Sequence, residues 1–293
     1  MPRLEVCIDS VESAVAAQAG GAARLEICDS LVEGGTTPSI GKLICCLRHV
    51  SIPVHAMLRP RGGDFLYSAA EQEVILEDAS ALKEAGAHGI VFGALRADGT
   101  ADEPLLRAVI ARVAPLPVTF HRAIDVSADS LAVLDVCRRC GVARILTSGG
   151  ATEAMNGSAN LRLLVAAAGD ALQIAAGGGV SADNGECSLS DRTRAYALPT
   201  PASGVVNASR HIPTSLCAPA AATLLRNSGV DELHGSLRTT VPSAMQFRPK
   251  VPIYMGADKI NTPSIEFELR VTDAERVKAV VAVLGDGSSE RSP

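Results

Sequence analysis

The chain has 293 residues, of which 47% are hydrophobic and only 3% aromatic, and it contains no tryptophan. A core built from small aliphatic side chains suits parallel strands covered by helices better than a β-sandwich. The net charge of −5 and the lack of any basic run exclude a general nucleic-acid surface, and no apolar run is long enough to cross a bilayer.

The N-terminal sequence begins directly with a strand pattern and lacks the apolar region of a secretory signal peptide. We therefore expect a cytoplasmic protein. Thiols stay reduced in that compartment, so the eight cysteines are interpreted as free thiols rather than as a disulfide framework.

Short apolar strands alternate with Ala/Leu-rich helical segments along the chain. This alternation predicts a parallel sheet with right-handed crossovers, and eight such units close into a TIM (β/α)8 barrel. A doubly wound open sheet is the alternative, which is less favoured because no Gly-rich fingerprint follows the first strand. The predicted strands begin near Leu4, Ala23, Pro53, Gly89, Pro117, Ala143, Leu172 and Asp231.

An insertion interrupts the pattern between the seventh and eighth strands. Residues 185–220 are rich in Ser, Pro, Thr and Ala and show no sustained period, so they cannot bury enough apolar surface to offset the entropy of ordering them. Retained intron sequence and a natural insertion in a loop are the two explanations, which transcript sequencing distinguishes.

The C-terminal part is predicted to complete a single barrel domain that spans residues 1–284. Residues 245–268 contain three prolines and are expected to be irregular. A final helix over 272–284 closes the barrel, and residues 285–293 form a flexible tail.

Side-chain alternation divides each predicted strand into a face toward the helices and a face toward the barrel interior. In the first strand Leu4, Val6 and Ile8 face the helices. The interior is then unusually polar, whereas a barrel filled for stability alone is dominated by Val, Ile and Leu. The polar interior predicts a functional site. The alternative is an ion network without a function, in which Glu5 and Glu26 surround Arg59. The inward residues include Glu5, Cys7, Asp9, Glu26, Cys28, His55, Met57, Arg59, Thr119, His121, Gln173, Glu232, His234 and Ser236.

Cys7 and Cys28 fall near the carboxyl ends of adjacent strands with the same inward parity. Neighbouring strands lie about 5 Å apart, so the two sulfurs could share a soft metal ion such as Cu(I), with Met57 as a further ligand. The alternative is that both cysteines are small buried hydrophobic residues.

Two arginines beside a Gly-Gly turn, Arg59 and Arg61, are suited to bind a carboxylate or phosphate. The Gly-rich loop after the seventh strand adds bare backbone N–H groups, at the place where barrels often hold a phosphate. The predicted anion pocket consists of Arg59, Arg61, Asp125, Gly177, Gly178 and Ser236.

Acid–base chemistry is predicted for the same end of the barrel, where the loops after the strands lie. His121 with Asp125 as its carboxylate neighbour is suited to proton transfer near neutral pH, and His234 faces it across the barrel. Glu5 and Glu26 are the further candidate catalytic residues.

Several motifs together resemble the CutC copper homeostasis protein family, over the chain apart from residues 185–220. They are the segments EVCIDSVESA at 5–14, EGGTTPS at 33–39, RPRGGDF at 59–65, VFG at 91–93, PVTFHRA at 117–123, LTSG at 146–149 and GGG at 177–179.

The resemblance implies a TIM barrel, a cytoplasmic and nuclear location, a homo-oligomer, and a role in copper homeostasis through Cu(I) binding. Cys7 and Cys28 match the cysteines proposed as copper ligands in animal members. Some members carry a further cysteine near Ser236, which this chain lacks. The alternative function is a lyase- or isomerase-like barrel enzyme that acts on a small anionic or phosphorylated substrate.

Overall fold

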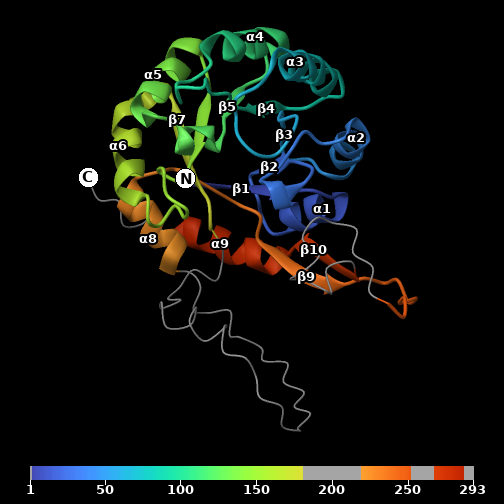
Figure 1. The fold of residues 1–293 in the computed structure, drawn as a ribbon. Coiled ribbons are helices and arrows are strands. Elements are labelled where there is room, and N and C mark those ends of the chain that lie inside the picture. The colour runs from blue at the N-terminus through green and yellow to red at the C-terminus, as the bar shows by residue number, and fades with distance from the viewer. Residues whose placement is uncertain (1, 181–218, 252–266, 287–293) are drawn as a thin grey trace.

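The computed structural model describes residues 2–180, 219–251 and 267–286. Eight parallel strands form a closed barrel in chain order, because β1 pairs with both β2 and β8 (Figure 1). The TIM barrel is therefore confirmed, the open sheet is excluded, and each strand begins within one residue of its predicted start. The strands are β1 Arg3–Ile8, β2 Arg24–Ile27, β3 Val54–Met57, β4 Gly89–Phe92, β5 Val118–Phe120, β6 Arg144–Thr147, β7 Gln173–Gly177 and β8 Glu232–Gly235.

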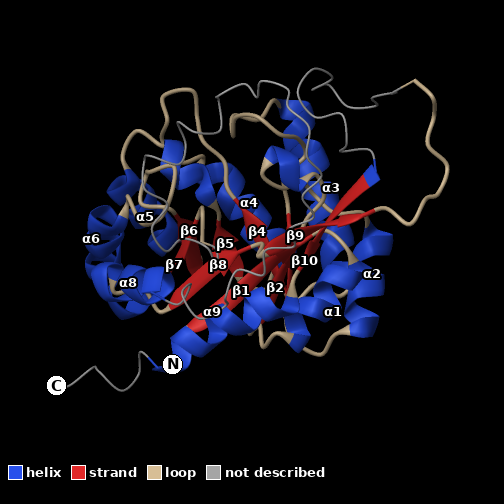
Figure 2. Cartoon of the chain, turned by 90° about the horizontal axis from the view of Figure 1, so that it is seen from below, coloured by secondary structure: helices blue, strands red, loops and turns tan. Residues whose placement is uncertain are grey.

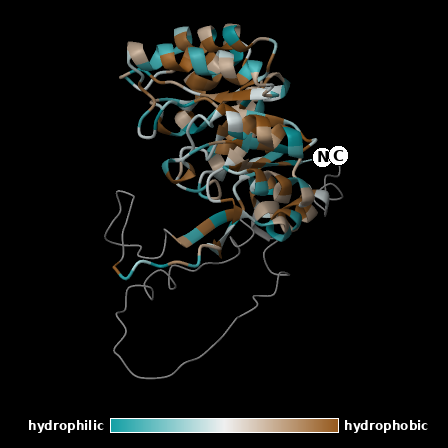
Figure 3. Ribbon diagram, turned by 90° about the vertical axis from the view of Figure 1, so that its right-hand side faces the viewer, coloured by the Kyte–Doolittle hydropathy of each residue, from teal (hydrophilic) through white to brown (hydrophobic). Residues whose placement is uncertain are grey.

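Helices surround the barrel (Figure 1), and those in view in Figure 3 carry both hydrophobic and hydrophilic residues. Several begin at a side-chain cap: Ser10 and Ser39 accept from the backbone of the first turn, and Ser68 forms a capping box with Glu71. The helices are α1 Val11–Ala19, α2 Ile40–His49, α3 Ala69–Glu84, α4 Glu103–Val113, α5 Ser130–Cys140, α6 Ser158–Ala168, α8 Pro219–Ser228 and α9 Ala274–Asp286, with 3-10 turns η1 Leu31–Glu33, η2 Arg122–Val126 and η3 Gly169–Ala171.

The main hydrophobic core lies between the strands and the helices. Leu4, Val6 and Ile8 of β1 are fully buried in it, as the alternation in the sequence predicts. Phe92 and Phe120 are the largest of the fully buried side chains. Because alternate side chains of each strand point into this outer core, the remaining side chains of the strand point into the barrel interior.

Residues 185–218 of the predicted insertion lie outside the described residues. Helix α8 already begins at Pro219, so the last two residues of the segment expected to be irregular are helical. Helix α9 extends to Asp286, two residues beyond the predicted domain end.

An antiparallel ribbon follows the barrel strands. Strand β9, Arg238–Pro242, pairs with β10, Glu268–Thr272, and β10 contacts α1 (Figure 2). Strand β10 was not predicted, because its register depends on a partner strand distant in sequence; it occupies the end of the segment expected to be irregular and the residues before the predicted final helix. Residues 252–266 of that irregular segment lie outside the described residues. Among the described residues, the helices are too short or too polar to cross a membrane.

Candidate functional site

Four charged side chains from the amino ends of β1, β2, β6 and β8 form a buried network inside the barrel. Arg24 Nε and Arg144 Nη2 donate to Glu5 Oε2 at 2.5 and 2.7 Å. Both guanidinium groups also donate to Glu232. Thr119 Oγ1 accepts from Arg144 Nε at 3.1 Å. Each carboxylate thus faces two guanidinium groups, the pairing under which buried charges are tolerated, while burial and the charge of Glu5 raise the pKa of Glu232 to about 7.

The sequence prediction missed the two arginines of this network. Arg24 shares the parity of Glu26, so the period of two could have placed it inside. Arg144 begins β6, whose inward residues the strand pattern left unassigned. Within the described residues Arg59 pairs with neither Glu5 nor Glu26, so the ion network exists but with different cations from the predicted one.

His234 links this network to the carboxyl ends of the strands. Its Nδ1 donates to Glu5 Oε1 at 2.8 Å, and its Nε2 lies 3.5 Å from Glu26 Oε2. Burial opposes a charged imidazole, but Glu26 and the hydrogen bonds to Cys7 and Glu5 raise the pKa of His234 well above its ordinary value. Burial also opposes ionisation of Glu5, yet His234 and Arg24 lower its pKa to about 2. A His234 cation therefore faces a Glu5 anion at neutral pH.

Cys7 and Cys28 lie side by side next to Glu26. Their Sγ atoms are 3.7 Å apart, and Cys28 Sγ is 3.6 Å from Glu26 Oε2. Met57 and Val91 form a small buried cluster with both cysteines. The hydrogen bond with Cys28, together with burial, raises the pKa of Cys7, and burial raises the pKa of Cys28 to about 11. Both are neutral thiols at pH 7 in the absence of a bound cation.

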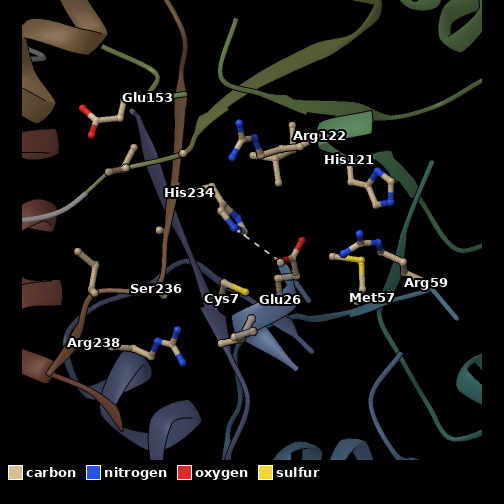
Figure 4. A pocket seen from close by; sticks show the side chains of 18 of the residues that line it. Cys7, Glu26, Met57, Arg59, His121, Arg122, Glu153, His234, Ser236 and Arg238 are labelled. Atoms are coloured by element: carbon tan, nitrogen blue, oxygen red, sulfur yellow. Dashed lines mark ion pairs between the residues drawn. The ribbon is translucent and has the colours of Figure 1, made fainter. Parts of the chain in front are cut away.

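Three residues from three strands offer donor atoms for one metal ion. Donor atoms of Cys7, Glu26 and His234 all lie within 4.8 Å of one another, and Figure 4 shows the three side chains converging. Cys28 adds a second sulfur on the Cys7 side. Thiolate and imidazole ligands suit Cu(I) and Zn²⁺, whereas carboxylate prefers harder ions. The geometry thus brings together the two predicted metal ligands and two of the predicted catalytic residues.

A cavity of ≈ 620 Å³ opens above these donors at the carboxyl ends of the strands, where TIM barrels carry their sites. Ribbon β9–β10 and α9, which sequence reasoning did not assign to a site, contribute three of its arginines. The polar lining residues are Cys7, Glu26, Arg59, His121, Arg122, Glu153, His234, Ser236, Arg238, Arg270 and Arg276.

Arg59 is 5% exposed and lies in the cavity wall. Its Nη1 donates to the carbonyls of Glu33 and Gly35 at 2.8 and 3.0 Å, and its Nη2 donates to that of Gly63 at 2.7 Å. The guanidinium therefore joins the loops after β2 and β3. Its Nε has no hydrogen-bond partner among the described residues.

His121 follows β5 and lies on the same wall. Its Nδ1 accepts from the N–H of Ala123 at 3.2 Å, and its ring centroid lies 4.9 Å from that of Phe65. Burial and the charge of Arg59 lower the pKa of His121 to about 3, so the ring is neutral at physiological pH. A Cβ on Gly93 would lie 2.5 Å from His121 Nδ1, which explains the glycine at the end of β4.

Two residues of the predicted anion pocket are engaged elsewhere. Arg61 donates to Glu71 at 2.5 Å and to Asp64 at 3.0 Å, and it does not line the cavity. Asp125 accepts from Arg122 Nε at 2.7 Å and holds the loop after β6 through backbone N–H groups, including that of Ser148 at 3.1 Å. Neither role was visible from the sequence, because both depend on the path of the loops.

The loops after β7 and β8 contribute only part of what was predicted. Gly178 and Ser236 line the cavity, whereas Gly177 ends β7 and does not. Gly178 has φ +107°, and a Cβ there would lie 3.1 Å from Arg122 Nη1. The glycine is thus required by its positive φ, which L side chains rarely adopt.

Sequence comparison identifies relatives over nearly the whole chain. The sequence model of the CutC family matches residues 2–196. A "copper homeostasis protein cutC homolog" from Mus musculus is 38% identical over 97% of this chain and 89% of its own length. The protein of the same name from Homo sapiens is 40% identical, over 96% of this chain and 88% of its own.

Solved structures show the same architecture. One from Streptococcus agalactiae, described as a CutC copper homeostasis protein, matches with a TM-score of 0.64 and 25% identity over 80% of this chain and 99% of its own. A thiamine phosphate pyrophosphorylase from Pyrococcus furiosus matches with a TM-score of 0.51 and 12% identity, over 97% of this chain and 96% of its own. The second likeness supports the barrel fold alone.

Proposed function

This chain belongs to the CutC family, and on that premise we propose that it serves copper homeostasis by binding one Cu(I) ion through the thiolates of Cys7 and Cys28. The observation that carries the proposal is the 3.7 Å separation of the two Sγ atoms inside the barrel. Soft thiolates suit Cu(I), and the cavity, which Cys7 lines, gives the ion a route to the pair.

The separation of the sulfurs favours a site with more than two ligands. With metal–sulfur bonds of about 2.3 Å, two ligands of a linear site are roughly 4.6 Å apart, and those of a trigonal or tetrahedral site roughly 3.8–4.0 Å. The observed 3.7 Å is nearer to the second range. Of the neighbouring donors, the His234 imidazole suits Cu(I) better than the Glu26 carboxylate does. We therefore assign His234 as the third ligand.

Copper binding at this site must release protons. Both thiols are protonated at neutral pH, because burial and their mutual hydrogen bond raise the pKa of Cys7 and burial raises that of Cys28. His234 is also protonated before it can coordinate. The bound cation replaces these protons, so the affinity for Cu(I) rises with pH.

The test is an anaerobic titration with Cu(I) in competition with a coloured Cu(I) chelator. We expect one ion per chain for the parent protein and loss of that ion in the Cys7→Ser/Cys28→Ser double variant. Cys45→Ser is the matched control, because Cys45 is an exposed thiol on α2. The ligand assignment fails if the double variant and the control bind Cu(I) with the same affinity as the parent.

A second candidate function is supported by the contact between His234 and Glu26. An imidazolium and a carboxyl group 3.5 Å apart at the base of a cavity can serve as acid and base for a small anionic substrate. Burial raises the pKa of Glu26 above that of an exposed carboxyl group, which favours its holding a proton. Glu5 then acts by holding His234, and His121 lines the substrate side. Substrate-dependent proton exchange with deuterated solvent, lost in Glu26→Gln, is the expected result for an enzyme.

Location and assembly follow from the family resemblance as further proposals. A cytoplasmic and nuclear location is tested by microscopy of a fluorescent fusion in cells. A homo-oligomer is tested by analytical ultracentrifugation of the purified chain, for which a single sedimenting species of monomer mass is the contrary result.

A further inference from the structure

Arg59 is a buried cation on the cavity wall without a counter-charge in the described part of the chain. Its outer N–H groups donate to backbone carbonyls, among them those of Gly35 and Gly63, and its charge also acts on the buried Tyr67 hydroxyl, whose pKa it lowers against the effect of burial. Its Nε–H has no acceptor among the described residues. A charged side chain that is only 5% exposed is costly unless an opposite charge and a full set of hydrogen bonds accompany it. An anion in the cavity would supply both.

His121 presents a second donor without an acceptor on the same wall. Because Nδ1 accepts the N–H of Ala123, the neutral ring must carry its proton on Nε2. That Nε2–H is buried and has no partner among the described residues. The imidazole is thus held as a hydrogen-bond donor, and it cannot serve as an acceptor toward the cavity.

The two donors belong to one surface. The Phe65 ring lies 4.9 Å from the His121 ring centroid and 4.9 Å from Arg59 Cζ, so it packs against both side chains. Figure 4 shows Arg59, His121 and Arg122 along one side of the cavity, next to His234 and Glu26. Buried polar atoms normally find a protein or solvent partner, and two orphan donors on one wall indicate a ligand with acceptor oxygens.

We infer that the cavity contains an oxyanion subsite in which one carboxylate or phosphate group accepts hydrogen bonds from Arg59 Nε and His121 Nε2. The subsite differs from the anion pocket expected from the sequence, because Arg61 and Asp125 take no part in it. A cavity of ≈ 620 Å³ is within the range of small-molecule sites and leaves room for the organic part of the ligand. The inference stands on this geometry, whether the chain binds copper or acts as an enzyme.

The test is isothermal titration of the metal-free protein with inorganic phosphate and, separately, with malonate, both at constant ionic strength in chloride. We expect at least one probe to bind, and the stronger of the two identifies the headgroup. His121→Asn keeps an oxygen that can cap Ala123 but loses the Nε2 donor, and Arg59→Lys keeps the cation but loses the Nε donor. Each should weaken binding by about 10- to 100-fold, the value of a hydrogen bond to a charged group.

Arg61→Gln is the matched control, because Arg61 lies two residues from Arg59 but outside the cavity. It should bind the probe as the parent does. The inference is overturned if neither probe binds in the millimolar range, or if Arg61→Gln weakens binding as much as His121→Asn. If Arg59→Lys fails to fold, His121→Asn alone decides. Cu(I) titration of His121→Asn separates this result from the copper proposal, because it should leave the thiolate site unchanged.

Discussion

Removing Arg144 tests how much the buried network contributes to stability. Arg144 is 3% exposed and donates to both Glu5 and Glu232, so Arg144→Met leaves Glu232 with Arg24 alone, while Glu5 keeps both Arg24 and His234. Breaking a buried ion pair by removing one partner costs roughly 3–5 kcal/mol, because an uncompensated charge remains. That is a large fraction of a total stability of roughly 5–15 kcal/mol.

The measurement is the free energy of unfolding from urea titration at pH 7. Arg139→Ala is the matched control: Arg139 pairs with Asp135 and Glu103 on the surface, where ion pairs contribute about 0–1 kcal/mol. Adding Glu232→Gln to Arg144→Met should restore part of the loss, because the number of unpaired charges falls. The reasoning is refuted if Arg144→Met costs no more than Arg139→Ala.

Three further predictions concern the cavity wall and the thiols. Gly93→Ala should destabilise the chain by about 1–3 kcal/mol through its clash with His121, whereas Gly41→Ala, which has open space around its Cβ, should not; thermal unfolding measures both. Burial lowers the pKa of His121 to about 3, below an unfolded value near 6.5. The stability that the neutral ring contributes is therefore complete above pH 6.5 and is lost as pH falls toward 3. In urea titrations across that range, the free energy of unfolding of the parent should fall relative to that of His121→Asn. Cu(I) affinity should rise up to about 1,000-fold per pH unit between pH 6 and 8 if Cys7, Cys28 and His234 each release one proton, and a pH-independent affinity would contradict the proposed site.

The barrel and the parity of its strands could be predicted because both depend on local pattern. Alternation places Leu4 and Val6 toward the helices and Glu5 and Cys7 inside, and the closed barrel keeps that division along every strand. A slip of one residue would have put charged groups into the apolar core. The cost of burying charged groups in the apolar core therefore fixes the register, and it is the register that the alternation in the sequence indicates.

The partners of the polar side chains could not be predicted in the same way. Arg59 and Arg61 are two residues apart and look alike in sequence, yet one faces the cavity and the other pairs with Glu71 on α3. The direction of each depends on the turn at Gly62 and Gly63 and on which carbonyls the loop after β2 presents. Such contacts join segments distant in sequence, and no periodicity reports them.

Glu5 connects the stability of the barrel to the chemistry of its mouth. One carboxylate oxygen accepts from Arg24 and Arg144 in the buried network, and the other accepts from His234 at 2.8 Å. The network therefore fixes the orientation of the His234 ring, leaving Nε2 directed toward Glu26. A variant that loosens the network should consequently shift the titration of His234 even though it touches no donor atom of the metal cluster. Histidine NMR titration of Arg144→Met would detect that shift, and an unchanged His234 titration would show that the two layers are independent.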